Sequence, residues 1–124
     1  MDLLEVFKDS EDMVEFPAGS VIIAEGNEGS HMYVVMQGEV DISLKGKVIA
    51  TALPGEIVGE MALIDAAIRS ATVTATTDCQ LAVIDQSSFN SLLQHVPDFT
   101  LHVMNVLAGR LKIAYDMIED QDVR

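Results

Sequence analysis

Basic residues, cysteines and long apolar runs are scarce in this sequence. Its 124 residues contain 7 Lys or Arg against 20 Asp or Glu, which gives a net charge of −13 with neutral histidines. A surface this acidic repels the phosphates of nucleic acids and the headgroups of anionic membranes. We therefore expect no nucleic-acid partner and no membrane partner, although the charge says nothing against a small ligand.

Cysteine occurs once, as Cys79, which excludes an internal disulfide, a Cys-only zinc site and a four-cysteine iron–sulfur cluster. The first residues, Met1–Glu5, are acidic and lack the basic and apolar regions of a signal peptide. No apolar run is long enough to span a bilayer. We therefore expect a cytoplasmic protein, and the length suits a single domain over residues 1–124.

Glycines and β-branched residues dominate the first two thirds of the chain. Val40, Ile42 and Leu44 alternate with polar residues, and residues 71–76 alternate in the same way, as strands with one buried face do. Residues 45–47 are typical of a hairpin turn. Seven glycines lie between these stretches: Gly19, Gly26, Gly29, Gly38, Gly46, Gly55 and Gly59. This pattern predicts an all-β sandwich or barrel in the middle of the chain.

Both ends of the chain have helical patterns. Residues 2–8 predict a short amphipathic helix, Asp85 offers an N-cap for a helix over 87–96, and residues 98–120 predict one long helix. The long helix carries an apolar seam at spacings of 3, 4, 3 and 4: Met104, Leu107, Leu111, Ala114 and Ile118. Such a helix needs two covering surfaces. We expect the β core and a second copy in a homodimer, with packing inside one chain as the alternative.

The segment 55–71 carries the most chemical information. Gly55 and Gly59 precede a short helix-forming run over residues 60–65, and such a helix start exposes backbone N–H groups to an anion. Arg69 follows and is the only Lys or Arg between residues 48 and 109. Two interpretations are open: a salt bridge from Arg69 to Glu60 or Asp65 that orders a loop, or a clamp for a phosphate group.

The same segment resembles the phosphate-binding cassette of cyclic nucleotide-binding domains, as in bacterial catabolite activators and the regulatory subunits of cAMP-dependent protein kinases. The family pattern appears as Gly59-Glu60-Met61-Ala62-Leu63 followed by Arg69-Ser70-Ala71. Matching segments also occur along the rest of the chain, at residues 16–19, 25–26, 32–35, 38–40 and 97–111. The resemblance therefore covers nearly the whole sequence.

The resemblance implies a mainly β fold with flanking helices. The expected architecture is an antiparallel β jelly roll (a double-stranded β-helix) with a short N-terminal helix and a long C-terminal helix. Its parts would be an N-terminal helical segment at 1–13, the jelly roll at 14–85 with the cassette at 55–71, and C-terminal helices at 86–120.

The resemblance also assigns roles to individual residues of the cassette. Arg69 would pair with the exocyclic oxygens of a cyclic phosphate, and the backbone amides of Gly59, Met61 and Ala62 would donate to the same group. Glu60 would accept a hydrogen bond from the ribose 2′-hydroxyl. The expected ligand is therefore cAMP or cGMP.

Three positions bear on the base and on the departures from the family pattern. Ser70 would donate to the phosphate and could reach a guanine amino group, which leaves the base open with cAMP preferred. Ile68 stands where relatives often have proline, and its freer φ would loosen the loop. Tyr115 on the long helix is a candidate cap that stacks on or hydrogen-bonds the base, with a plain surface role as the alternative.

Other functions fit less well. His31, His95 and His102 are dispersed, and no catalytic pair or triad stands out, so we expect no enzyme, no metal site and no cofactor besides the nucleotide. The expected function is a sensor that transmits occupancy through its C-terminal helix. The alternatives are a ligand-free jelly-roll scaffold for protein–protein interaction, or the sensor half of a truncated transcription regulator.

Overall fold

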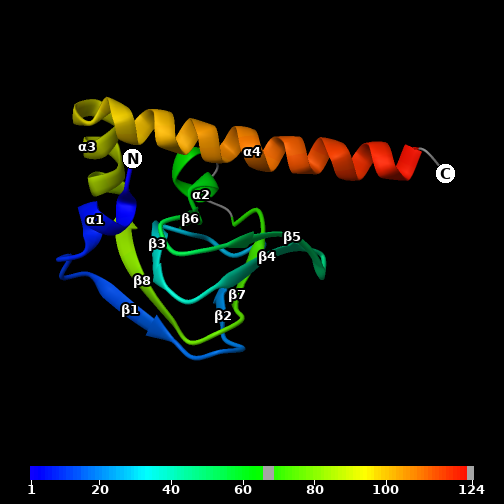
Figure 1. Ribbon diagram of the computed structural model, residues 1–124, viewed down its shortest axis with the longest axis horizontal. Coiled ribbons are helices and arrows are strands. Elements are labelled where there is room, and N and C mark those ends of the chain that lie inside the picture. The colour runs from blue at the N-terminus through cyan, green and yellow to red at the C-terminus, as the bar shows by residue number, and fades with distance from the viewer. Residues whose placement is uncertain (66–68, 123–124) are drawn as a thin grey trace.

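Two four-stranded antiparallel sheets form the body of the molecule (Figure 1). The computed structural model describes residues 1–65 and 69–122. The strands follow the order β1-β8-β3-β6 in the first sheet and β2-β7-β4-β5 in the second. In chain order they are β1 (Met13–Phe16), β2 (Val21–Ile23), β3 (His31–Gln37), β4 (Val40–Leu44), β5 (Lys47–Ala52), β6 (Ile57–Val58), β7 (Thr72–Ala75) and β8 (Cys79–Asp85). The predicted antiparallel β fold is confirmed.

Helices flank the sheets at both ends of the chain, as predicted. They are α1 (Leu3–Phe7), α2 (Met61–Ile64) within the cassette, α3 (Gln86–His95) and α4 (Pro97–Asp122). The carboxylate of Asp2 accepts from the first amides of α1, and Asp85 caps α3 by accepting from the Ser88 amide at 2.7 Å. Each cap satisfies backbone N–H groups that have no partner inside the helix.

A tight hairpin joins β4 to β5. Leu44 pairs with Lys47, and the two residues between them, Lys45 and Gly46, have φ values of 49° and 83°. Two consecutive positive φ angles are characteristic of the type I′ turn, which suits the twist of the strands on either side. The hairpin brings side chains of both strands to the edge of the site described below.

The core has two layers, and β3 belongs to both. Met32 and Val34 pack in the cluster beneath the helices, whereas Tyr33 and Val35 pack in the cluster between the two sheets. The first cluster includes Phe89 of α3 and Phe99 of α4, whose rings meet edge to face at 6.0 Å. The aromatic contact fixes both C-terminal helices on the first sheet.

Helix α4 is buried at its start and exposed towards its end. Phe99 and Val103 are 0% and 3% exposed, whereas Leu111 and Ile118 are 51% and 54% exposed. Figure 1 shows the last turns of α4 extending past the sheets. Only the first half of the helix therefore docks on its own chain. No helix in residues 1–65 and 69–122 is long and apolar enough to cross a membrane.

We expect His102 to make the docking of α4 sensitive to pH. Its Nε2 is buried without a partner among the described residues, and burial, then the N-terminal amino group, lower its pKa, with Glu56 opposing. A lowered pKa means that the folded chain binds the proton less readily than the unfolded chain. The stability that His102 contributes should be present above its unfolded pKa of about 6.5 and should be lost as pH falls below it.

We therefore expect His102→Leu to become more stable relative to the original chain as pH falls from neutral. The quantity compared is the free energy of unfolding. Urea denaturation of both proteins at pH 7.5 and 5.5 measures this difference. An identical pH dependence for the two would contradict the assignment.

Candidate ligand-binding site

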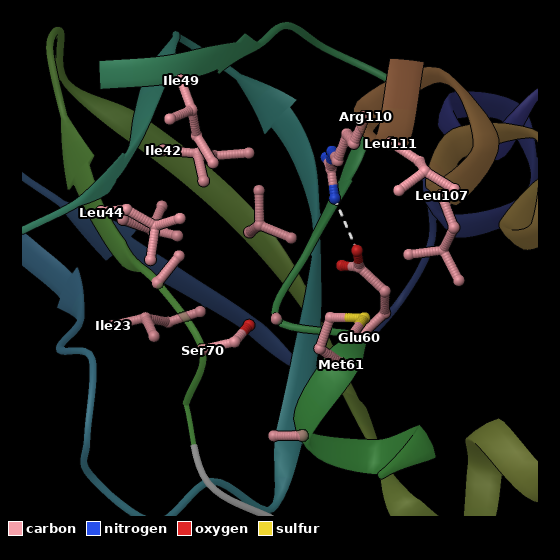
Figure 2. A pocket seen from close by; sticks show the side chains of 15 residues that line it. Ile23, Ile42, Leu44, Ile49, Glu60, Met61, Ser70, Leu107, Arg110 and Leu111 are labelled. Atoms are coloured by element: carbon pink, nitrogen blue, oxygen red, sulfur yellow. Dashed lines mark hydrogen bonds and ion pairs between the residues drawn. The ribbon is translucent and has the colours of Figure 1, made fainter. Parts of the chain in front are cut away.

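A cavity of about 430 Å³ lies between the second sheet, the cassette and α4 (Figure 2). Its walls come from elements far apart in the sequence, which the fold brings together. The lining residues are Ile23, Ile42, Leu44, Ile49, Val58, Gly59, Glu60, Met61, Ala62, Ser70, Ala71, Val73, Leu107, Arg110 and Leu111. Nearly all of them are apolar, and the two charged residues, Glu60 and Arg110, form one ion pair between the cassette and α4.

Glu60 is the buried acid of this ion pair. It is 2% exposed, and its Oε1 accepts from the Arg110 Nη1 at 2.6 Å. Its Oε2 is buried and has no hydrogen-bond partner among the described residues. Figure 2 shows the carboxylate within the cavity wall, joined to Arg110 by the dashed line. A buried carboxylate oxygen without a donor is costly, so this atom is ready to accept a hydrogen bond from a ligand.

Arg110 of α4 is the functional residue that the sequence analysis missed. Besides the pair with Glu60, its Nη2 donates to the Ile57 carbonyl. The pair closes the cavity from the side of α4. Its sequence signal was present but not used: Arg110 lies three residues after Leu107 and one before Leu111, and therefore on the helix face that turns to the body.

Arg69 lies behind the cavity wall at Gly59. It is 8% exposed, and its Nη1 donates to the Gly59 carbonyl at 3.0 Å. Burial lowers the pKa of the guanidinium, and the charges of Tyr33 and Glu60 act in the opposite direction. Of the two interpretations of Arg69, the salt bridge to Glu60 or Asp65 is wrong: neither carboxylate lies within ion-pair distance of Arg69, and Glu60 pairs with Arg110 instead.

The loop before β3 holds Arg69 in place. The Arg69 amide donates to the Asn27 carbonyl at 2.7 Å, and the Gly26 amide donates to the Arg69 carbonyl at 2.8 Å. A Cβ on Gly29 would stand 2.2 Å from Arg69 Nε, and one on Gly59 would stand 2.9 Å from Nη1. The guanidinium therefore fills a slot between two glycines, and Gly29 is a second residue whose role the sequence did not single out.

We expect Gly29→Ala to lower the free energy of unfolding by about 1–3 kcal/mol, because the new methyl group overpacks the slot. The same substitution in an Arg69→Ala background should cost far less, since the clashing atoms are gone. Urea denaturation of the four proteins of this double-mutant cycle measures the coupling. Additive effects would show that Gly29 does not act through Arg69.

The other predicted site residues of the cassette belong to the lining of the cavity. Met61, Ala62 and Ser70 line the cavity together with Gly59 and Glu60, and the amides of Met61 and Ala62 donate to no other described residue. Ile68 lies outside the described residues.

The structure places Tyr115 on the surface, which corrects its expected role as a cap over the base. It is 58% exposed and does not line the cavity. Leu107, Arg110 and Leu111 close the cavity instead, because the docked part of α4 ends about one turn before Tyr115.

The comparison with protein families now decides the family. The model described as cyclic nucleotide-binding domain matches residues 13–96. The chain belongs to the cyclic nucleotide-binding domain family. The resemblance seen in the cassette is thereby confirmed.

Two curated relatives support this assignment. The Pycsar effector protein XpPycTIR of Xanthomonas perforans is 33% identical over 101 residues, which cover 81% of this chain and 33% of the relative. The cAMP-dependent protein kinase regulatory subunit of Schizosaccharomyces pombe is 38% identical over 91 residues, which cover 73% and 22%. The chain thus spans a third or less of either relative.

Solved structures confirm the jelly-roll architecture with its flanking helices. The catabolite activator protein of Thermus thermophilus superposes with a TM-score of 0.76 at 28% identity, over 89% of this chain and 54% of that one. A structure described as cAMP-bound PfPKA-R gives 0.76 at 26% identity, over 92% and 43%.

Proposed function

We propose that the cavity binds one 3′,5′-cyclic ribonucleotide, with its phosphate at Arg69 and its ribose at Glu60. The observation that carries this proposal is the presence of two buried groups without partners among the described residues: Arg69 has no ion-pair partner, and Glu60 Oε2 has no donor. The carboxylate belongs to the lining of an apolar cavity, and the arginine lies directly behind that lining, where its Nη1 donates to the Gly59 carbonyl. A cyclic nucleotide supplies both missing partners, an anionic phosphate and a 2′-hydroxyl, together with a base for the apolar walls.

The phosphate contacts require a short movement of Arg69. Its Nη1 now donates to the Gly59 carbonyl, and a bound phosphate would replace this neutral acceptor by two charged oxygens. Charge-assisted bidentate contacts of this kind are stronger than a neutral hydrogen bond, and they would offset the cost of burying the guanidinium. The amides of Gly59, Met61 and Ala62 and the hydroxyl of Ser70 would complete the phosphate site.

Transmission would run through the Arg110–Glu60 pair. Glu60 serves the ligand with one oxygen and α4 with the other, so occupancy changes the environment of the residue that holds the helix. Ligand binding would shift α4 between two docked arrangements, by no more than the difference in ligand affinity between them. We infer that the chain acts by binding rather than by catalysis.

We also propose that the chain forms a homodimer along α4. In the predicted seam, Leu107 and Leu111 line the cavity, whereas Met104, Ala114 and Ile118 are exposed. A second copy packed along α4 would cover these residues and would connect two sites through two helices. Analytical ultracentrifugation should detect a dimer at high protein concentration, and Ile118→Asp should abolish it. A monomer under all conditions, with and without cAMP, would remove this part.

A thermal-shift panel tests the proposed function. The chain is heated with cAMP, cGMP, 5′-AMP, 2′-deoxy-cAMP or buffer, each nucleotide at the same concentration. Ligand at one hundred times its Kd stabilises the folded state by about 2.7 kcal/mol, so cAMP and cGMP should raise the Tm. The linear and deoxy forms should have much smaller effects. No response to any nucleotide would favour the scaffold alternative.

A further inference from the structure

Around the Arg110–Glu60 pair, the cavity presents aliphatic surfaces to whatever base it holds. Ile42, Leu44 and Ile49 gather on one side of the Arg110–Glu60 pair in Figure 2, and Leu107 and Leu111 on the other. Such walls contact the flat face of any purine through dispersion and burial, and neither depends on the groups at the ring edge.

Few polar side chains remain to recognise the base edge. Among the described residues that line the cavity, only Glu60, Ser70 and Arg110 carry side-chain nitrogen or oxygen atoms. Arg110 already donates from both terminal nitrogens, to Glu60 and to the Ile57 carbonyl. Ser70 lies near Ile23 at the cassette end of the cavity (Figure 2), where the proposed phosphate would occupy its hydroxyl.

Three of the residues that line the cavity are partly exposed to water. Leu44 is 41% exposed, Met61 40% and Leu111 51%. A base edge placed here keeps its hydration, so no group on it is left buried and unpaired. Strong discrimination between bases arises when a site buries polar groups that only one base can match, and this cavity offers no such group apart from the engaged ones.

We propose that the domain selects the cyclic ribose phosphate and discriminates little between purine bases. This inference rests on the proposed function, and it names the ligand class as purine 3′,5′-cyclic ribonucleotides in general. Arg69 and Glu60 select the cyclic ribose phosphate. The aliphatic walls supply affinity that adenine, guanine and hypoxanthine share.

Isothermal titration with cAMP, cGMP and cIMP tests the inference. The three bases differ in their edge groups: adenine has an amino group, guanine an oxygen and an amino group, and hypoxanthine an oxygen alone. We expect all three Kd values to fall within tenfold of one another, with 2′-deoxy-cAMP and 5′-AMP outside that range. A difference above tenfold among the three cyclic purines would overturn the inference and leave the proposed function intact. Absence of binding by all three would overturn both.

Three variants, one of them a control, separate the affinity supplied by the apolar walls from recognition of the base. Leu111→Ala should weaken cAMP, cGMP and cIMP by the same factor of about threefold to tenfold, because about 25 cal/mol is lost for each Å² of apolar contact. Leu101→Ala is the matched control: Leu101 is 57% exposed on the same helix, lies outside the proposed dimer seam and does not line the cavity, so the substitution should change none of the three affinities. Ser70→Ala should change the ratio of cAMP to cGMP affinity by less than threefold. A selective loss of cGMP binding in this variant would assign base recognition to Ser70 and contradict the inference.

Discussion

Replacement of Arg69 by alanine should weaken cAMP binding by about 30- to 1,000-fold, equivalent to about 2–4 kcal/mol. The loss is large because the substitution removes the charged group proposed to meet the phosphate in a place where water is largely excluded. The free energy of unfolding should change much less, since Arg69 is a buried cation that has no ion-pair partner in residues 1–65 and 69–122, and its removal relieves that burial. Isothermal titration and urea denaturation measure the two quantities separately.

Arg69→Lys is the matched control for this prediction. Lysine keeps the charge but lacks the planar pair of donors that meets two phosphate oxygens, so its affinity should lie between those of the original chain and Arg69→Ala. An unchanged Kd in Arg69→Ala, with a folded protein, would show that the phosphate does not bind at this residue.

Replacement of Arg110 by alanine should lower the free energy of unfolding by about 2–4 kcal/mol. It leaves the Glu60 carboxylate 2% exposed with neither oxygen paired, which is the costly way to break a buried ion pair. We place the loss towards the lower end because the Arg110 side chain is itself 23% exposed. The second half of α4 should also exchange its amide hydrogens faster, because no described side chain of the helix after Arg110 bonds to the body.

Lys112→Ala is the matched control on the same helix, since Lys112 is exposed and takes no part in the cavity. It should leave stability and hydrogen exchange nearly unchanged. The double variant Glu60→Gln/Arg110→Met should be more stable than Arg110→Ala, because it removes the stranded charge. If Arg110→Ala matched Lys112→Ala in both measurements, the pair would not hold α4.

Local patterns predicted most of the fold. Alternation marked β4, glycine placement marked the β4–β5 hairpin and other turns, and Asp85 marked the start of α3. These signals depend on neighbours in the sequence, so they can be interpreted without tertiary information. The cassette was found in the same way, because its glycines and Arg69 are close together in the chain.

The sequence alone did not show which residues of α4 line the cavity. Helical periodicity showed which side chains share a face, but not where along its length the helix leaves the body. That point depends on the docking of Phe99 and Val103 against the first sheet, a contact between distant segments. The expectation therefore fell on Tyr115, whereas Arg110 lies at the last docked turn. Gly29 was missed for the same reason, since its effect on Arg69 acts across forty residues of sequence.

A crystal structure of the chain with cAMP tests the central claim most directly. The account predicts one nucleotide in the cavity, with the cyclic phosphate about 2.7–2.9 Å from the guanidinium of Arg69. The ribose 2′-hydroxyl should donate to Glu60 Oε2, and the base should lie against the aliphatic walls. A nucleotide bound elsewhere, or one in the cavity with Arg69 still bonded to the Gly59 carbonyl and no phosphate contact, would contradict the account.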